Sequence, residues 1–241
     1  MSLAGKHVLI TGGARRIGKA LALGVAKAGG SVSIHYGQSM IEGQKFLEEI
    51  HTLGQDARLI QADLNDLSQV ADIVRKACVP GPIYALINNA AIFEPLTWEN
   101  TDLEAWQRHL NINLTAPFLL SQAFARQILP GESGRIINIV DWRALRPGAD
   151  HLPYTISKAG LVALTQSLAV ALAPNINVNG IALGAVLPLN DGSDATQVLL
   201  NVPAQRWSTL DEVVELLLFL LDGPAYLTGE IIHLDGGRHL I

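Results

Sequence analysis

Seven short runs of apolar residues alternate with stretches of helical periodicity, and this alternation constrains the fold more than any other feature of the chain. Because parallel strands need crossover connections, usually helices, the order predicts a parallel sheet with helices on both faces. No linker or repeat interrupts it, so we expect a single α/β domain over residues 1–241. Strands are predicted at 6–10, 31–36, 57–62, 83–87, 135–140, 176–181 and 230–234, and helices at 19–28, 41–53, 67–78, 104–129, 154–172 and 209–221.

The composition of the 241-residue chain argues against several classes of protein. With 49% hydrophobic and 16% charged residues the chain can bury a large core, and a net charge of −5 without a basic patch argues against a nucleic-acid partner. The single cysteine, Cys78, cannot form an internal disulfide and suits a reducing compartment. The longest apolar run, residues 213–221, is too short to span a membrane. We therefore expect a cytoplasmic protein with no membrane partner, and the scattered histidines predict no metal site.

A glycine-rich loop joins the first predicted strand to the first predicted helix. Glycines at such a junction permit a tight turn and let the backbone approach a pyrophosphate, which the helix N-terminus then stabilises. The spacing is not G-x-G-x-x-G, and a glycine turn without a ligand is the alternative interpretation. We predict a dinucleotide site with contacts from Gly12, Arg15, Arg16, Ile17 and Gly18.

The end of the second predicted strand indicates which dinucleotide binds. Residues 35–39 are His-Tyr-Gly-Gln-Ser, with no acidic side chain to accept hydrogen bonds from a ribose 2′-hydroxyl. A 2′-phosphate would be repelled by a carboxylate and attracted by Arg15 and Arg16, although either arginine could be only solvated. The sequence therefore favours NADP(H) over NAD(H).

Tyr154 and Lys158 are four residues apart in a predicted helix, so their side chains share one face. An ammonium beside a phenol favours the phenolate, and we expect Lys158 to lower the pKa of Tyr154 from about 10 toward working pH. Asp141 follows the fifth predicted strand, and the strand end should bring its carboxylate close to both. Tyr154 is thus a candidate general acid or base, although such pairs also occur on solvated helix faces.

Together these residues resemble the short-chain dehydrogenase/reductase family over essentially the whole chain. The resemblance implies a Rossmann-type, doubly wound sheet of seven parallel strands that binds a nicotinamide cofactor. It rests on motifs in a fixed order: Thr11-Gly…Gly18, Asp63 after the third strand, Asn88-Asn89-Ala90, Asn113 in Asn-Ile-Asn-Leu-Thr, Tyr154-x-x-x-Lys158, and Asp235-Gly-Gly near the end.

The resemblance also implies roles for the matching residues. Tyr154 would be the acid/base, Lys158 would hold the nicotinamide ribose, and Asn113 would hold a water that links the lysine to bulk solvent. The implied cofactor contacts are Gly12 and Gly18 at the pyrophosphate, Asp63 and Leu64 at the adenine, Asn89 and Ala90 by its ribose, and Ala91 and Gly184 in the neighbouring turns.

Departures from the family pattern are similar to one branch, the pteridine reductases, which include bacterial dihydromonapterin and dihydrofolate reductases. Arg16 replaces the usual loop glycine, and Asp141 replaces the usual catalytic serine. Phe93 stands where that branch stacks a pterin over the nicotinamide. The branch's NADPH site is matched by His35, Tyr36 and Ser39, whereas Gln38 stands where it often has an arginine.

Asp141 favours chemistry at a ring nitrogen. A serine hydroxyl can donate a hydrogen bond to a ketone oxygen that becomes negative, whereas an ionised aspartate repels that oxygen. A carboxylate instead suits the N–H donors of a pterin. We predict that NADPH reduces a pterin C=N bond with Tyr154 as proton donor, and that Phe93, Arg16, Asp141 and Trp142 contact the substrate. Asp141 as a turn cap and Phe93 as core packing are the alternatives.

Two other functions stay open at this point. One is a carbonyl reductase or alcohol dehydrogenase acting on a sugar, a steroid or a 3-oxoacyl thioester, against which Asp141 argues. The other is a cofactor-binding sensor without catalysis, against which Tyr154, Lys158 and Asn113 argue. Residues 187–207 occupy the family's substrate lid. The resemblance further implies a small-molecule substrate and a homotetramer or homodimer.

Overall fold

A sheet of seven parallel strands forms the centre of the computed structural model, which describes residues 2–79, 81–187 and 198–241. The strand order β3-β2-β1-β4-β5-β6-β7 reverses direction between β1 and β4, as a doubly wound sheet does. The predicted fold class is therefore confirmed. The strands are β1 (His7–Ile10), β2 (Ser31–Tyr36), β3 (Ala57–Gln61), β4 (Ala85–Asn88), β5 (Gly134–Asp141), β6 (Ile176–Leu183) and β7 (Ile231–Leu234).

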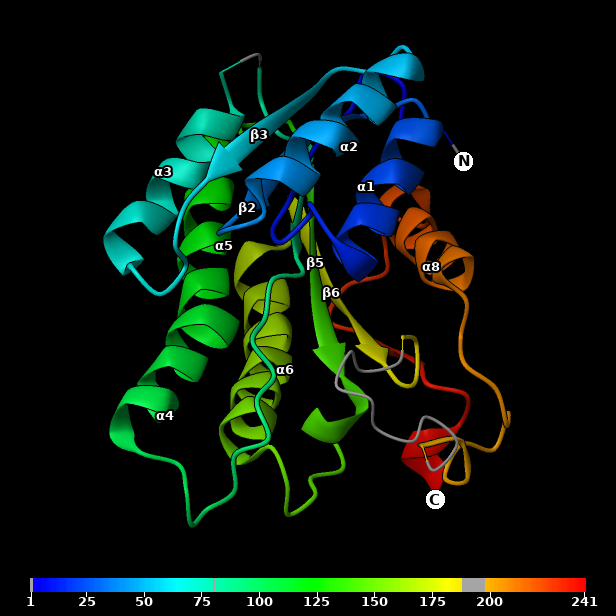
Figure 1. Ribbon diagram of the computed structural model, residues 1–241. Coiled ribbons are helices and arrows are strands. Elements are labelled where there is room, and N and C mark those ends of the chain that lie inside the picture. Colours follow the sequence, from blue (N-terminus) through cyan, green and yellow to red (C-terminus); the bar gives the residue numbers. More distant parts are fainter. Residues whose placement is uncertain (1, 80, 188–197) are drawn as a thin grey trace.

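Two layers of helices cover the sheet (Figure 1). One layer contains α1, α2 and α8, and the opposite layer contains α3, α4, α5 and α6. Each connection between strands thus returns over one face, which places every strand's carboxyl end at the same edge. The helices are α1 (Arg16–Lys27), α2 (Met40–Thr52), α3 (Leu67–Ala77), α4 (Leu103–Leu110), α5 (Ala116–Gln127), α6 (Leu152–Leu172) and α8 (Leu210–Asp222).

Strand side chains alternate between two cores because successive residues point to opposite faces of the sheet. In β1, Val8 and Ile10 enter the core beneath α1 and α8, while Leu9 enters the core beneath α3 and α5. In β5, Ile137 enters the core beneath α1 and α8, and Ile136 enters the core beneath α3 and α5. All five side chains are fully buried. The strands therefore bury apolar side chains on both faces of the sheet, and the loops at their carboxyl ends line the cleft described below.

The predicted continuous helix over residues 104–129 is wrong. The chain forms α4, then a π-helical turn over Asn111–Thr115, then α5. In this turn the N–H of Ala116 donates to the carbonyl of Asn111, five residues back. Pro117 has no N–H to donate to the carbonyl of Asn113, so a regular α-helix cannot continue there. The turn places Asn113 inside the protein, where it is fully buried.

Within residues 2–79, 81–187 and 198–241, α6 is the one helix that is long and apolar enough, by length and composition alone, to cross a membrane. It packs instead against β5 and β6, and its buried residues include Tyr154 and Lys158. One side of α6 belongs to the core, whereas Ile156 and Val170 on the same helix are exposed.

Candidate active site

A cleft of about 1030 Å³ opens beyond the carboxyl ends of the strands. It extends from the loop after β1 to the segment after β5 and the last turn of the chain. Of the sequence-predicted site residues, Asn113 alone is not among those that line it. The predicted residues that line the cleft are Gly12, Arg15, Arg16, Ile17, Gly18, His35, Tyr36, Ser39, Asp63, Leu64, Asn89, Ala90, Ala91, Phe93, Asp141, Trp142, Tyr154, Lys158 and Gly184.

The loop between β1 and α1 has no room for larger side chains at two glycines. Gly12 has a φ of +62°, which favours glycine. A Cβ on Gly18 would overlap the carbonyl oxygen of Gly12 and lie 2.7 Å from the side-chain nitrogen of Asn89. Arg16 also has a positive φ, +51°, which explains why the family usually has glycine there. Holding an arginine in this conformation costs about 1 kcal/mol.

Thr11 and Asn89 join this loop to the turn after β4. The Thr11 hydroxyl accepts hydrogen bonds from the backbone N–H groups of Asn89 and Ala90, at 2.9 and 3.0 Å. The Asn89 amide donates to the carbonyl oxygens of Thr11 and Gly12, at 2.8 and 3.3 Å. The two turns that meet at the predicted pyrophosphate site therefore form one hydrogen-bonded unit.

The His35 ring joins the glycine loop to the end of β3 by hydrogen bonds. Its Nδ1 accepts a hydrogen bond from the Gly12 N–H at 3.3 Å, and its Nε2 lies 3.1 Å from the carbonyl oxygen of Ala62. Burial lowers the pKa of His35 to about 4, so the ring is neutral and Nε2 is the donor. Both ring nitrogens are thus bonded to the backbone, and His35 has no donor left for a phosphate.

The end of β2 offers other groups to a ligand. Gly37 and Gln38 are exposed there, and Ser39 precedes α2 without using its hydroxyl as a helix cap. Arg15 lies across this part of the cleft and approaches Glu42 at 3.9 Å. At the neighbouring end of β3, Asp63 is exposed and Leu64 is buried.

Tyr154 and Asp141 form the central polar pair of the site. The Tyr154 hydroxyl donates to Oδ2 of Asp141 at 2.9 Å, and Oδ1 of Asp141 accepts from the backbone N–H of Arg143 at 2.9 Å. Burial raises the pKa of Asp141. The predicted lowering of the Tyr154 pKa is wrong for this structure. Burial, followed by the charge of Asp141, raises the pKa of Tyr154 well above its ordinary value.

Lys158 lies on the same side of α6 as Tyr154, with its Nζ 5.9 Å from the centre of the tyrosine ring. The ammonium donates to the carbonyl oxygen of Ile139 at 2.6 Å. Burial lowers the pKa of Lys158 to about 8, although the nearby Asp141 opposes the change. The prediction that strand β5 and helix α6 bring a carboxylate, a phenol and an ammonium together is therefore borne out by the geometry.

Asn113 connects the loop after β4 with helix α6. Its Oδ1 accepts from the N–H of Ile92 at 2.9 Å, and its Nδ2 donates to the carbonyl of Ile92 and to the Ser157 hydroxyl, at 3.1 and 3.0 Å. Ser157 in turn donates to the carbonyl oxygen of Tyr154 at 2.7 Å. Asn113 thus positions the residues beside the cleft, and the water relay implied by the resemblance stays a prediction.

Phe93 lies between two aromatic side chains at the substrate end of the cleft. Its ring centre is 4.6 Å from that of Tyr154 in an edge-to-face arrangement. On another side it packs against His151, with ring centres 3.9 Å apart. His151 is fixed by a hydrogen bond to the carbonyl oxygen of Glu94 at 2.9 Å. The half-exposed Phe93 ring is therefore held in place at the cleft and is not part of the core.

Two arginines that line the cleft, Arg143 and Arg238, are not among the residues predicted from the sequence. Arg143 follows Trp142 directly, and Arg238 comes from the last turn of the chain, 96 residues after Trp142. Only the folded chain brings Arg238 to the indole ring, so no local pattern could have indicated it. Trp207 and Leu187 also line the cleft. Of the predicted lid over residues 187–207, positions 188–197 lie outside the described residues.

The family model described as short chain dehydrogenase matches residues 6–197. The chain belongs to the short-chain dehydrogenase family. It is therefore an NAD(P)-dependent oxidoreductase of that family, and the cleft that contains Tyr154, Lys158 and the glycine loop is its candidate active site.

Individual relatives within the short-chain dehydrogenases differ in substrate. The structure of FolM alternative dihydrofolate reductase 1 from Brucella canis, complexed with NADP, is 36% identical with a TM-score of 0.94, and the match covers 99% of this chain and 96% of that one. The 3-oxoacyl-[acyl-carrier-protein] reductase of Synechocystis sp. is 32% identical over 98% of each chain. The 2-dehydro-3-deoxy-D-gluconate 5-dehydrogenase of Dickeya dadantii is 32% identical over 98% of this chain and 96% of that protein.

Proposed function

We propose that the protein is an NADPH-dependent reductase that reduces a C=N bond of a pterin-like substrate. The observation that carries the proposal is the hydrogen bond from Tyr154 to Asp141. Burial raises the pKa of both groups, and the pKa of Tyr154 lies well above its ordinary value, so the phenol keeps its proton at neutral pH. Such a pair serves as a proton donor, which a ring nitrogen needs when hydride reaches the adjacent carbon.

The remaining residues at this end of the cleft support a flat, heteroaromatic substrate. Phe93 offers an aromatic ring at a fixed position, and Trp142 also lines this end of the cleft. When ionised, Asp141 can accept hydrogen bonds from ring N–H or amino groups. Lys158 carries a positive charge below about pH 8 and would favour transfer of the Tyr154 proton by stabilising the phenolate that remains.

The other half of the cleft fits NADP(H). Gly12 and Gly18 line the cleft at the start of α1, where a pyrophosphate would bind at the helix N-terminus. Arg15, Arg16 and Ser39 line the part of the cleft near the end of β2 and would hold a 2′-phosphate. When bound, the reduced nicotinamide supplies the hydride. That the Brucella canis relative was solved with NADP supports this choice over NAD(H).

A carbonyl reductase is the second candidate, and a specific finding favours it. The relatives from Synechocystis and Dickeya dadantii are named as a 3-oxoacyl reductase and a sugar-acid dehydrogenase. Because burial raises the pKa of Asp141, a protonated carboxyl there could donate to a ketone oxygen as a serine does.

Steady-state assays separate the two functions. NADPH oxidation by the purified protein would be measured with dihydrobiopterin and with a panel of ketones, and Asp141→Ser would be assayed in parallel. The pterin function predicts turnover of dihydrobiopterin that falls about 100-fold or more in the variant. Turnover of ketones alone, with a higher rate in Asp141→Ser, would overturn it. Asp150→Asn serves as control, because Asp150 pairs with Arg143 at 2.6 Å and does not bond Tyr154.

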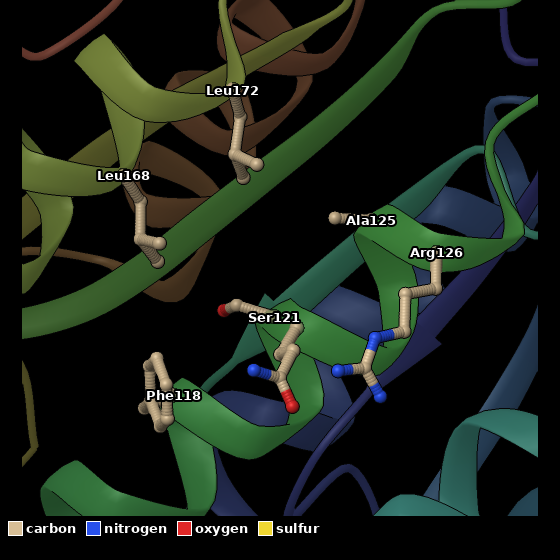
Figure 2. Close-up of a pocket in the computed structure, with 7 residues that line it drawn as sticks. Phe118, Ser121, Ala125, Arg126, Leu168 and Leu172 are labelled. Carbon is tan, nitrogen blue, oxygen red and sulfur yellow. The ribbon is translucent and has the colours of Figure 1, made fainter. Parts of the chain in front are cut away.

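We also propose that the protein acts as a homotetramer or homodimer, and that α5 and α6 form one of its interfaces. A shallow hollow of about 370 Å³ lies between these helices (Figure 2). Phe118, Leu168 and Leu172 line it, with Phe118 39% exposed, and Val170 on the same helix as the leucines is 83% exposed. Such apolar surface supports a protein contact. Sedimentation of wild type and Phe118→Glu at matched concentrations tests it, since a monomeric wild type would contradict the proposal.

A further inference from the structure

Arg238 reaches the substrate end of the cleft from the last turn of the chain. Its guanidinium carbon lies 4.1 Å from the centre of the Trp142 ring, and both residues line the cleft. At this distance the planar guanidinium is attracted to the indole ring, which limits its rotation. The arrangement fixes a positive group beside the position proposed for the substrate.

The C-terminal turn is built to hold Arg238 there. The buried Asp235 accepts hydrogen bonds from the N–H of Gly237, at 3.0 Å, and from the N–H and ring of His239, both at 2.8 Å. Gly237 has a φ of +85°, which lets the chain reverse at this point. A Cβ on Gly184 would lie 2.6 Å from the Cα of Asp235, so glycine at position 184 lets the turn pack against the end of β6.

Arg238 has no acidic partner among the described residues. No carboxylate lies within salt-bridge distance of its guanidinium, and its Nε is buried without a hydrogen-bond partner. The neighbouring Arg143 lies 5.2 Å from the same indole ring, but its charge is balanced by Asp150 at 2.6 Å. Burial, followed by the charge of Arg143, lowers the pKa of Arg238. An arginine nevertheless remains charged at neutral pH.

We propose that Arg238 binds an anionic substituent of the substrate, a carboxylate or a phosphate, on the Trp142 side of the cleft. This inference rests on the proposed function only in taking the substrate ring to be pterin-like. A half-buried guanidinium without a carboxylate partner among the described residues pairs well with a planar, two-oxygen anion. Arg238 would therefore be a specificity-determining residue that selects substrates with an acidic side group over neutral analogues.

Ligand pairs that differ in this group test the inference. In the NADP+ complex, dissociation constants would be measured calorimetrically for folate, whose side chain carries carboxylates, and for neutral 6-methylpterin, with wild type and Arg238→Gln. We expect Arg238→Gln to weaken folate binding about 10- to 100-fold and to change 6-methylpterin binding less than about twofold. A phosphorylated pterin alcohol, compared with its free alcohol, shows whether phosphate is accepted as well.

Three matched variants separate recognition from folding. Arg238→Lys retains the charge, so it should bind folate more tightly than Arg238→Gln does. Arg75→Gln removes an exposed arginine of α3 and should leave the dissociation constants of folate and 6-methylpterin unchanged. Melting temperatures show whether Arg238→Gln is folded. Equal losses for folate and 6-methylpterin would overturn the inference, because they would indicate a structural role.

A second pair of ligands keeps this inference distinct from the proposed function. KM and kcat would also be compared for an aromatic keto acid and its methyl ester. If pterins neither bind nor turn over, the proposed function fails. The role of Arg238 in binding an anionic group is still supported if the KM for the keto acid rises about tenfold or more in Arg238→Gln while the KM for the ester is unchanged. If wild type prefers the anionic member of neither pair, the inference is overturned.

Discussion

The phenol of Tyr154 and the carboxyl of Asp141 are joined by a single hydrogen bond of 2.9 Å, which favours the ionised carboxylate and opposes ionisation of the phenol. In the usual family pattern a serine hydroxyl occupies the position of Asp141. The exchange of a neutral hydroxyl for an acid therefore changes the proton chemistry of the whole site.

Asp141→Asn is expected to lower the pKa of Tyr154. Burial is the largest cause of the raised value and would remain, but the repulsive charge and the carboxylate acceptor would both be lost. An ultraviolet difference titration of phenolate formation measures this, with Tyr154→Phe to identify the signal. Asp150→Asn, which leaves the hydrogen bond intact, is the control. An unchanged tyrosine titration in Asp141→Asn would show that Asp141 does not govern Tyr154.

The lowered pKa of Lys158 predicts that the free energy of unfolding depends on pH. Its pKa is about 8 in the folded protein and about 10.5 in the unfolded chain, so the unfolded chain binds more protons between these values. The free energy of unfolding of wild type should therefore rise with pH from 8 to 10.5, by up to about 3 kcal/mol, relative to Lys158→Met. Denaturant titrations at several pH values measure the difference. Parallel curves for the two proteins would contradict it, and the exposed Lys27→Met is the control.

Gly18→Ala is expected to destabilise the protein by about 1–3 kcal/mol and to weaken NADPH binding. The new methyl group meets the Gly12 carbonyl, which the loop cannot move without breaking its bonds to Asn89. Gly43→Ala in α2 is a matched control, because the nearest atoms to its methyl group are the flexible end of Leu59, with Ala14 at an ordinary contact distance of 3.8 Å. It should be neutral or slightly stabilising. Thermal unfolding and fluorescence titration with NADPH measure both effects, and equal behaviour of the two variants would count against the loop geometry.

Ser39→Asp tests the choice of dinucleotide. A carboxylate at the end of β2 repels a 2′-phosphate but can accept hydrogen bonds from a ribose 2′-hydroxyl. We expect the KM for NADPH to rise about tenfold or more and the KM for NADH to stay equal or fall. Ser39→Asn, which has the same shape without the charge, should change the NADPH value much less. If Ser39→Asp leaves the ratio of the two constants unchanged, the 2′-phosphate does not lie at Ser39.

Much of the fold and the arrangement of the site followed from local patterns. Strand runs such as residues 135–140 and the glycine loop are local, and a parallel sheet brings their ends to one edge. The π-helical turn at Asn113 was missed, although Pro117, four residues later, carries a signal for it. That residues 1–241 form one domain stays a prediction.

Energies of burial and contacts between distant segments could not be predicted in the same way. The pKa of Tyr154 was assigned from its neighbour Lys158, whereas its burial and its bond to Asp141 determine the direction. The place of Arg238 depends on the packing of Asp235 against Gly184, which joins the ends of β7 and β6. The role of His35 was likewise concealed, because its ring bonds the backbone of two other loops.

The hydrogen bonds of Thr11, Asn89 and Asn113 hold the loops of the cleft together without the C-terminal turn. Through them the loop after β1 is tied to the turn after β4, and that turn to helix α6, without any contact from the C-terminal turn. Residues 235–241 take no part in these bonds, so exchanging them for those of another family member that keeps Asp235, which packs against Gly184, should leave the cofactor and proton-donating halves in register. We expect that exchanging this short C-terminal segment between family members also exchanges their substrate preference.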